Sequence, residues 1–359
     1  MLPKKLQKRI QDRIEKGTLR SLSSFEGIDF ISNDYLGLSS FDVSGNDEGS
    51  TGSRLISGNR KSTEEAEERL ASFFGGASGL CFNSGYDANL GVFSSIPQRG
   101  DRILFDEAIH ASVRDGMRLS LANSHSFNHN DAKDLKRLLD KPCEGTTYIA
   151  VEALYSMHGD MAPLRSIVEL TKEADAKLIV DEAHSAGVYG KDGRGLVHAL
   201  DLEADVFIRL VTFGKAYGGH GAVVLADKDV NQYLMNFARS FIYTTALPSA
   251  SYMRMEEVVH HDDLNDRRFK LMDNIQCFRE NIELDVVSEV NSPIQMVRLG
   301  NVDDAYLIQE ELNKVGIDAK AVFSPTVKEG EESVRVCIHS FNTIAEIQSL
   351  TSILNEFKS

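Results

Sequence analysis

Short apolar runs alternate with longer helix-like patterns between about residue 75 and residue 226 of this chain. Alternation of this kind is typical of strand–helix–strand units that form a largely parallel sheet. Several runs are continuously apolar, as expected of strands that are buried on both faces. We therefore predict an α/β fold with a mostly parallel central sheet. The predicted strands lie at 80–82, 102–105, 147–151, 177–180, 206–211 and 222–225.

The pattern changes after Asp227, where a charged helical stretch runs to about Asn281. Two short strand-like runs follow, at 295–299 and 334–338, and a length of 359 residues favours two domains over one. We predict three parts of the chain, with two domains that pack closely because no flexible linker separates them. The parts are an N-terminal arm over residues 1–40, a large domain over 41–235 and a small C-terminal α/β domain over 236–359.

Charge and cysteine content narrow the class of protein. The chain has 39 basic and 54 acidic side chains and a net charge of −15, which repels nucleic acid and anionic membrane surfaces. Its four cysteines are scattered without a C-x-x-C pair or metal-ligand spacing, as is typical of reduced thiols. No apolar run approaches the roughly 18 residues of a membrane span, and a secretion signal is not recognisable. We expect a cytoplasmic protein without disulfides, metal, nucleic-acid partner or stable membrane association.

Polar residues directly follow four of the predicted strands, at 83–86, 152–156, 181–184 and 212–215. In open α/β sheets, ligands bind beyond the carboxyl ends of the strands. An aspartate can keep a pyridine nitrogen protonated, and a lysine amine can condense with an aldehyde. Asp181, His184 and Lys215, in this order, therefore predict a pyridoxal-phosphate site in which Lys215 holds the cofactor as a Schiff base.

Two other enzyme classes are compatible with isolated motifs. Residues 181–184 spell Asp-Glu-Ala-His, the second motif of DEAH-type helicases, but a phosphate-binding loop requires glycine where this chain has Arg209 and Ser or Thr where it has Ala216. A hydrolase elbow G-x-S-x-G fails because Phe82 stands two residues before Ser84. A binding or scaffold protein that kept the fold without the cofactor is an alternative of a different kind.

The sequence resembles the α-oxoamine synthases, fold-type I pyridoxal-phosphate enzymes that condense an amino acid with an acyl thioester and release CO₂. The resemblance covers nearly the whole chain. It rests on segments 32–38, 52–58, 84–89, 109–112, 129–131, 156–160, 181–187, 193–195, 212–215 and 243–248. It implies a fold-type I transferase with a large, mostly parallel domain and a smaller C-terminal α/β domain.

The resemblance also implies roles at the reaction centre. Lys215 would hold the cofactor and later remove the α-proton of the amino acid. Asp181 would pair with the pyridinium nitrogen, and His184 would hydrogen-bond the phenolic oxygen. His110 would stack on the ring face and contact the substrate.

Other residues would complete the cofactor site, largely around the phosphate. The backbone N–H groups of Gly85 and Tyr86 would bind it, which the missing Cβ at Gly85 makes sterically easy. In this family the cofactor lies at a dimer interface, and a threonine of the Thr244-Thr245 type reaches the phosphate from the neighbouring subunit. A homodimer is therefore implied. The residues assigned to cofactor binding in addition to those above are Ser84, Ser156, Thr212, Thr244 and Thr245.

The substrate residues implied by the resemblance are Arg20, Asn33, His110, Thr326 and Arg335. Asn33 and Arg335 match the family's carboxylate-binding residues, since a guanidinium can hold a carboxylate through two parallel bonds.

Four activities share these motifs. The residues at 18–20, 221–225 and 324–327 resemble those of the enzymes that condense L-alanine with a pimeloyl thioester of CoA or of a carrier protein. This reaction gives 8-amino-7-oxononanoate for biotin synthesis, and we expect it here. The alternatives are glycine with acetyl-CoA, the synthesis of 5-aminolevulinate, and serine with a palmitoyl thioester. Two positions depart from the family: Thr63 replaces a histidine, and His158 replaces the aspartate of Ser-Met-Asp-Gly-Asp.

Overall fold

The computed structural model describes residues 4–16, 27–40, 49–323, 327–328 and 330–357. Two residues predicted to bind substrate, Arg20 and Thr326, lie outside these ranges. Within the described residues, no helix combines the length and the apolar character that a membrane crossing requires.

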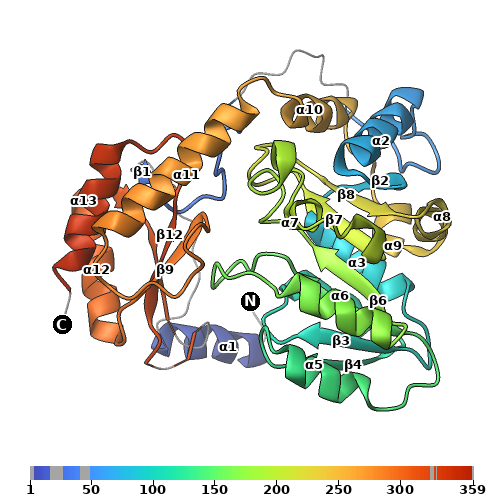
Figure 1. The fold of residues 1–359 in the computed structure, drawn as a ribbon, viewed down its shortest axis with the longest axis horizontal. Coiled ribbons are helices and arrows are strands. Elements are labelled where there is room, and N and C mark those ends of the chain that lie inside the picture. The colour runs from blue at the N-terminus through green and yellow to red at the C-terminus, as the bar shows by residue number, and fades with distance from the viewer. Residues whose placement is uncertain (1–3, 17–26, 41–48, 324–326, 329, 358–359) are drawn as a thin grey trace.

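A seven-stranded sheet forms the centre of the larger part of the molecule, as Figure 1 shows. Only β8 runs antiparallel to its neighbours, so the predicted mostly parallel sheet is confirmed. The sequence did not predict β4, because four of its five residues are exposed at the edge of the sheet and it lacks an apolar run. In spatial order the strands are β2 (Ser78–Phe82), β8 (Ala222–Ala226), β7 (Ile208–Thr212), β6 (Lys177–Asp181), β5 (Thr147–Glu152), β3 (Arg102–Asp106) and β4 (Asn123–Phe127).

Helices cover both faces of this sheet, and alternate residues of each strand point to opposite sides. Leu104 and Leu178 belong to one apolar cluster, whereas Ile103 and Ile179 belong to a second. The first cluster includes residues of α2 (Lys61–Phe74), α5 (Ala132–Leu139), α6 (Leu164–Glu173) and α7 (Leu196–Ala199). The second includes residues of α3 (Gly85–Ser95), α4 (Ala111–Leu119), α8 (Lys228–Phe237) and α9 (Arg239–Ile242).

The C-terminal part has its own antiparallel sheet, which lies beside the larger part in Figure 1. Its strands, in the order β11 (Lys320–Val322), β12 (Ser333–Cys337) and β9 (Ile294–Arg298), confirm the strand-like runs predicted at 295–299 and 334–338. The helices of this region are α11 (Leu264–Asn281), α12 (Val302–Lys314) and α13 (Ile344–Asn355), whereas the preceding α10 (Ser249–Val259) packs against α2 of the larger part. Buried residues of all four helices join the first apolar cluster.

An N-terminal segment, residues 27–40, packs against the C-terminal sheet. Its strand β1 (Ile28–Asp29) pairs in parallel with β10 (Ile317–Asp318), and the amide of Cys337 donates to the carbonyl of Phe30 over 2.9 Å. The preceding helix α1 (Lys4–Glu15) is largely exposed. The proposed division of the chain therefore assigns segment 27–40 and the C-terminal sheet that it contacts to different parts. The proposed boundaries at residues 40 and 235 remain a proposal.

Candidate active site

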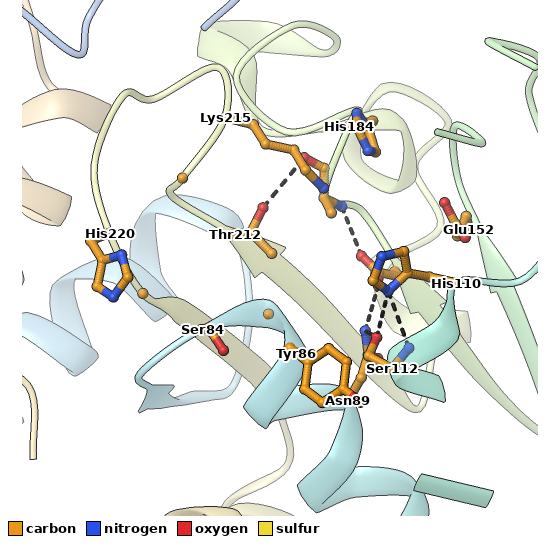
Figure 2. Close-up of a pocket in the computed structure, with 15 residues that line it drawn as sticks. Ser84, Tyr86, Asn89, His110, Ser112, Glu152, His184, Thr212, Lys215 and His220 are labelled. Carbon is orange, nitrogen blue, oxygen red and sulfur yellow. Dashed lines mark hydrogen bonds between the residues drawn. The ribbon is translucent and has the colours of Figure 1, made fainter. Parts of the chain in front are cut away.

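The carboxyl ends of the parallel strands meet at one edge of the large sheet, where the residues after them surround a cavity of about 240 Å³. Strand register brings these ends together, because Glu152 of β5 lies opposite Asp181 of β6 and Thr212 of β7 opposite the first residue of β8. Figure 2 shows the cavity with side chains from several strand ends directed into it. The residues of the sequence-predicted site that line it are Ser84, Gly85, Tyr86, His110, Asp181, His184, Thr212 and Lys215.

Lys215 follows β7 and has an unusual electrostatic environment. Desolvation lowers the pKa of Lys215 below its ordinary value, whereas the nearby carboxylates of Asp181 and Glu152 act in the opposite direction. The positive charge of Arg335 adds to the lowering. A lower pKa increases the fraction of neutral amine, which is the form that can act as a nucleophile or a base.

Asp181 is the buried last residue of β6, and two N–H groups fix its carboxylate. Its Oδ2 accepts a hydrogen bond from Asn89 Nδ2 (2.7 Å), and its Oδ1 accepts one from the amide of Ala183 (2.9 Å). The same Asn89 nitrogen donates to Ser112 Oγ (3.0 Å). Asn89 was not predicted from the sequence, although it lies one helical turn after Gly85 and so points to the same side of α3.

His110 caps the start of α4 and lies at the end of this hydrogen-bond chain. Its Nδ1 lies 2.8 Å from Ser112 Oγ and accepts from the Ser112 amide (3.3 Å), so the network assigns the proton of the neutral ring to Nε2. Burial lowers the pKa of His110, and the charge of Lys215 acts in the same direction. The nearby carboxylate of Asp181 acts in the opposite direction, and the net lowering favours the neutral ring.

His184 is buried beside Tyr35, a residue that was not predicted to take part in the site. Tyr35 Oη lies 2.9 Å from His184 Nδ1 and 3.1 Å from Asn33 Oδ1. Burial lowers the pKa of His184 well below its usual value, and the charges of Lys215 and Arg335 add to this effect. Tyr35 lies in segment 32–38, which is one of the segments that carry the family resemblance. This membership was the one feature of the sequence that could have identified Tyr35 as a residue of the site.

The start of α3 faces the cavity and offers an anion site. Ser84 is the N-cap, whose side chain and carbonyl accept from the amides of Asp87 and Ala88. The first amides of a helix have no intrahelical acceptor, so those of Gly85 and Tyr86, which line the cavity, are available to bind an anion. A Cβ on Gly85 would stand 2.5 Å from Thr212 Cγ2, which explains why glycine is required here.

Glu152 is a further residue of the cavity that was not assigned a role from the sequence. It is buried, and its Oε1 has no hydrogen-bond partner within the described part of the chain. Burial raises the pKa of Glu152 to about 8, and the negative charge of Asp181 on the adjacent strand acts in the same direction. His220, just before β8, also lines the cavity without having been predicted.

Asn33, Ser156 and Arg335, which we call the arginine cluster, lie beside the cavity but do not line it. Arg335 is on β12, and its Nε donates to the carbonyl of Ser156 (2.9 Å). Its Nη2 donates to Asn33 Oδ1 (3.1 Å). Tyr35 connects this cluster to the cavity, because it contacts both Asn33 and His184.

Thr244 and Thr245 lie next to the start of α3 in the same chain, outside the residues that line the cavity. Asn83 Nδ2 donates to Thr244 Oγ1 and to the carbonyl of Thr245, each over 2.9 Å. The predicted contact of these threonines with a phosphate of the neighbouring subunit stays a prediction.

Comparison with known proteins places the chain in a family. Residues 26–352 match the family model described as aminotransferase class I and II. An 8-amino-7-oxononanoate synthase of Emericella nidulans is 39% identical over 384 residues, which cover 96% of this chain and 92% of the relative. The enzyme of the same name from Aliivibrio fischeri is 35% identical, with 92% and 88% covered.

Two solved structures share the fold over nearly the whole chain. Serine palmitoyltransferase of Sphingomonas wittichii superimposes with a TM-score of 0.90 at 25% identity, covering 99% of this chain and 98% of that one. The 8-amino-7-oxononanoate synthase of Francisella tularensis has a TM-score of 0.78 at 31% identity, with 92% and 97% covered. The chain therefore belongs to the aminotransferase class I and II family, and within it to the α-oxoamine synthases with a fold-type I architecture.

Proposed function

We propose that this chain condenses L-alanine with a pimeloyl thioester, with loss of CO₂, to give 8-amino-7-oxononanoate and the free thiol. Relatives of that name, 35–39% identical over nearly the full length, support the reaction. The observation that supports it most directly is the meeting of Lys215, Asp181 and His184 with the start of α3 in one cavity. The cofactor is pyridoxal 5′-phosphate, which is bound in a solved structure of a related serine palmitoyltransferase.

The residues of the cavity fit this cofactor by their chemistry. An amine at Lys215, a carboxylate at Asp181 and a helix start at Gly85 match its aldehyde, its pyridine nitrogen and its phosphate respectively. Thr212 adds a hydroxyl near the helix start. When bound, pyridoxal phosphate supplies an electron sink that stabilises negative charge at the α-carbon of an amino acid.

Lys215 would hold the cofactor through Nζ and, once the amino acid has displaced it, would take the α-proton. The lowered pKa of this amine favours the neutral form that such a base requires. Asp181, oriented by Asn89, would keep the pyridine nitrogen protonated. The neutral ring of His110 would stack on the cofactor ring, and His184, held by Tyr35, would contact the phenolic oxygen.

The arginine cluster would bind the carboxylate of the substrate. A guanidinium has five N–H groups, and three of those of Arg335 donate to Ser156, Asn33 and Cys337. Tyr35 is a further side-chain partner of this guanidinium, so a substrate carboxylate would replace some of these contacts. A guanidinium can hold a carboxylate through two parallel hydrogen bonds.

We propose that the enzyme acts as a homodimer in the cytoplasm. Tyr86, which lines the cavity, is 44% exposed, and Tyr243, beside Thr244, is 72% exposed. Tyrosine is enriched at interfaces between proteins, and a second copy of the chain would cover these two side chains. Four free cysteines are consistent with a reducing compartment.

A second candidate, the condensation of serine with a palmitoyl thioester, is favoured by one observation. The serine palmitoyltransferase structure superimposes more closely than the 8-amino-7-oxononanoate synthase, with TM-scores of 0.90 and 0.78. A TM-score compares backbones, whereas substrate choice depends on side chains. The sequence of this chain is 31% identical to that of the 8-amino-7-oxononanoate synthase and 25% identical to that of the serine palmitoyltransferase. We therefore keep alanine and the pimeloyl thioester as the proposal.

Two experiments test the proposal separately. Reduction of the purified protein with borohydride followed by peptide mapping should place a pyridoxyl group on Lys215, and its absence there would refute the assignment of this lysine. Thiol release should then be measured with alanine, glycine and serine, each against pimeloyl-, acetyl-, succinyl- and palmitoyl-CoA. We expect the highest kcat/KM for alanine with pimeloyl-CoA. A preference for serine with palmitoyl-CoA would instead support the second candidate.

A further inference from the structure

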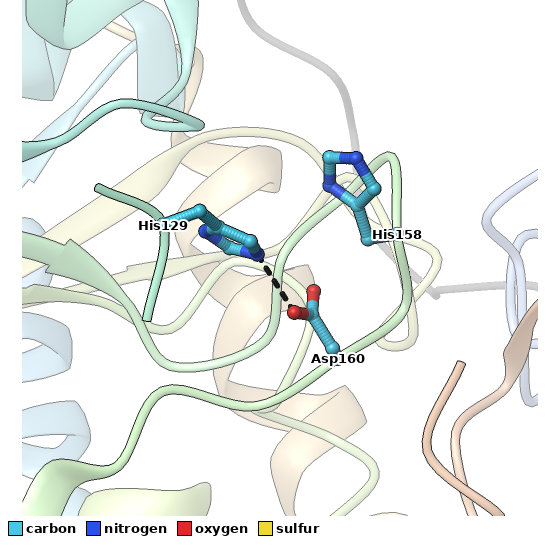
Figure 3. A group of neighbouring side chains, drawn as sticks. All are labelled: His129, His158 and Asp160. Carbon is cyan, nitrogen blue, oxygen red and sulfur yellow. Dashed lines mark hydrogen bonds and ion pairs between the residues drawn. The ribbon is translucent and has the colours of Figure 1, made fainter. Parts of the chain in front are cut away.

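His129, His158 and Asp160 form a compact group of side chains, here called the histidine cluster. His129 follows β4, whereas His158 and Asp160 belong to the loop between β5 and α6. One possible ligand atom of each residue lies within 4.8 Å of those of the other two. Figure 3 shows His129 hydrogen-bonded to Asp160, with the ring of His158 above them. The cluster is separate from the cavity, whose lining includes none of the three residues.

His129 is already oriented by a carboxylate on its far side. Its Nδ1 lies 2.8 Å from Asp106 Oδ1, and its Nε2 points to Asp160 Oδ2 at 2.7 Å. Asp106 is fully buried and accepts from the amides of Ala108 and Asn130, each over 2.8 Å. Metal-binding histidines in proteins often have a carboxylate on one ring nitrogen, as Asp106 is here. The other ring nitrogen of His129 also contacts a carboxylate, and despite burial the two carboxylates raise the pKa of His129 to about 10, so a metal ion would compete with a proton for Nε2.

The other two residues present polar atoms without partners. His158 Nδ1 and Asp160 Oδ1 are buried and make no hydrogen bond within the described part of the chain. A buried polar atom without a partner destabilises the folded chain, so two such atoms in one small group point to a ligand that would satisfy them. A cation accepts lone pairs from an imidazole nitrogen and a carboxylate oxygen together, and would satisfy both atoms.

The loop that carries His158 and Asp160 is held in place independently of any ion. Ser288 Oγ donates to the carbonyl of His158, and Gly159 has a φ of +66°. A Cβ on Gly159 would stand 2.2 Å from the carbonyl oxygen of Ile294, so only glycine fits there. The backbone thus fixes the positions of His158 and Asp160 on either side of this glycine.

We propose that the histidine cluster binds one divalent cation of the zinc class through His129 Nε2, His158 Nδ1 and the carboxylate of Asp160. Two imidazoles with one carboxylate favour Zn²⁺, Co²⁺ or Ni²⁺ over Mg²⁺ and Ca²⁺, which prefer oxygen ligands. Three protein ligands leave a coordination position for water. The metal would replace the proton shared between His129 and Asp160, so binding would release a proton. The expectation of no metal rested on cysteine spacing and could not detect ligands distant in sequence.

A metal here would stiffen a loop that also serves the proposed reaction. Ser156, two residues before His158, accepts the hydrogen bond of Arg335 through its carbonyl. The same loop contacts the C-terminal part of the chain through Ser288. The site is therefore distinct from the proposed catalytic chemistry, and it can be tested without turnover.

The test uses the holoenzyme after removal of any affinity tag and treatment with a chelator. Titration with Co²⁺ should produce visible absorption bands at one ion per chain, and Zn²⁺ should displace them and raise the melting temperature. His158→Asn should weaken Co²⁺ binding at least tenfold. His125→Asn is the matched control, because His125 is exposed on β4 outside the cluster and should leave Co²⁺ binding unchanged.

Absence of stoichiometric Co²⁺ binding, or equal binding by His158→Asn and His125→Asn, would overturn the proposal. Should His158→Asn fold poorly, Asp106→Asn provides a second variant that retains all three ligands. It should weaken Co²⁺ binding roughly 10- to 100-fold, as is typical of lost carboxylate support to a metal-binding histidine. Unchanged binding in Asp106→Asn would count against the site.

Discussion

The cavity and the arginine cluster are built in opposite ways. The cavity is formed by consecutive strand ends of one sheet, with its residues between Ser84 and Gly221. The arginine cluster joins residues that are 302 positions apart, because Asn33 lies in segment 27–40 and Arg335 on β12. The cavity is therefore set by a single rigid framework. The arginine cluster depends on how the C-terminal sheet lies against the large one.

This difference separates two tasks. Groups that act on a cofactor need fixed positions, which the ends of buried parallel strands provide. A group that binds a substrate carboxylate can instead lie on the C-terminal sheet. Its position then depends on how that sheet packs against the large sheet. Tyr35 is the residue that contacts both regions. The variants below test this separation, from the largest expected effect to the smallest.

Lys215→Ala should lower the rate of thiol release about a thousandfold or more, because it removes both the covalent attachment and the proposed base. Lys133→Ala, at an exposed lysine of α5, is the control and should retain the wild-type rate. Circular dichroism should show that both variants are folded. A loss of less than tenfold in Lys215→Ala would mean that another group removes the proton.

Arg335→Lys should raise KM for the amino acid roughly 10- to 100-fold, since an ammonium cannot replace two parallel hydrogen bonds to a carboxylate. Cofactor affinity, measured by fluorescence titration, should change little because Arg335 does not line the cavity. Equal losses of cofactor and substrate binding would show that the two regions are not separate.

Glu152 gives the cavity a pH-dependent stability. Its pKa in the folded chain is raised to about 8 from an ordinary value of 4.5, so between these values the folded chain keeps a proton that the unfolded chain releases. Stability from this group is fully present below pH 4.5 and falls as the pH rises toward 8.

Glu152→Gln should remove this contribution, because the amide stays neutral. Urea unfolding at pH 5.5 and pH 7.5 should then show a smaller decrease in unfolding free energy with pH than in the wild type. Glu169→Gln, at an exposed position of α6, is the control and should leave the decrease unchanged. An identical pH dependence in wild type and Glu152→Gln would argue that Glu152 is ionised.

Tyr35→Phe should have the smallest effect, about 1 kcal/mol or roughly fivefold in kcat/KM, because it removes one hydroxyl and leaves the aromatic packing. A double-mutant cycle with Arg335→Lys then measures the coupling between the two regions. Strictly additive losses would mean that Tyr35 does not connect them.

The sequence predicted the cavity better than the arginine cluster for a physical reason. Apolar runs identify buried strands, and the residues that follow parallel strands must meet at one edge, so Asp181 and Lys215 could be brought together without coordinates. The hydrogen bonds of Asn89 and Tyr35 depend on how α3 and segment 27–40 pack in the folded chain. A periodic pattern of apolar residues does not predict this packing. β4 was not predicted, because an exposed strand at the edge of a sheet needs no apolar residues.

The pairing of Asn33 with Arg335 could be proposed only through the family resemblance. No local pattern links segment 27–40 to β12, and the pairing of β1 with β10 is equally non-local. The histidine cluster is a similar case, because His129 and His158 approach each other only after β3 and β5 have paired.

The pairing of β1 with β10 has a consequence for the order of folding. During synthesis, the seven strands of the large sheet are complete once residue 226 has emerged, whereas β1 has no strand partner until β10 follows at residues 317–318. The buried Phe30 next to β1, whose carbonyl accepts from the amide of Cys337, must therefore remain without its final packing for most of translation. The nascent chain should acquire a site for the cofactor before it acquires one for the substrate carboxylate.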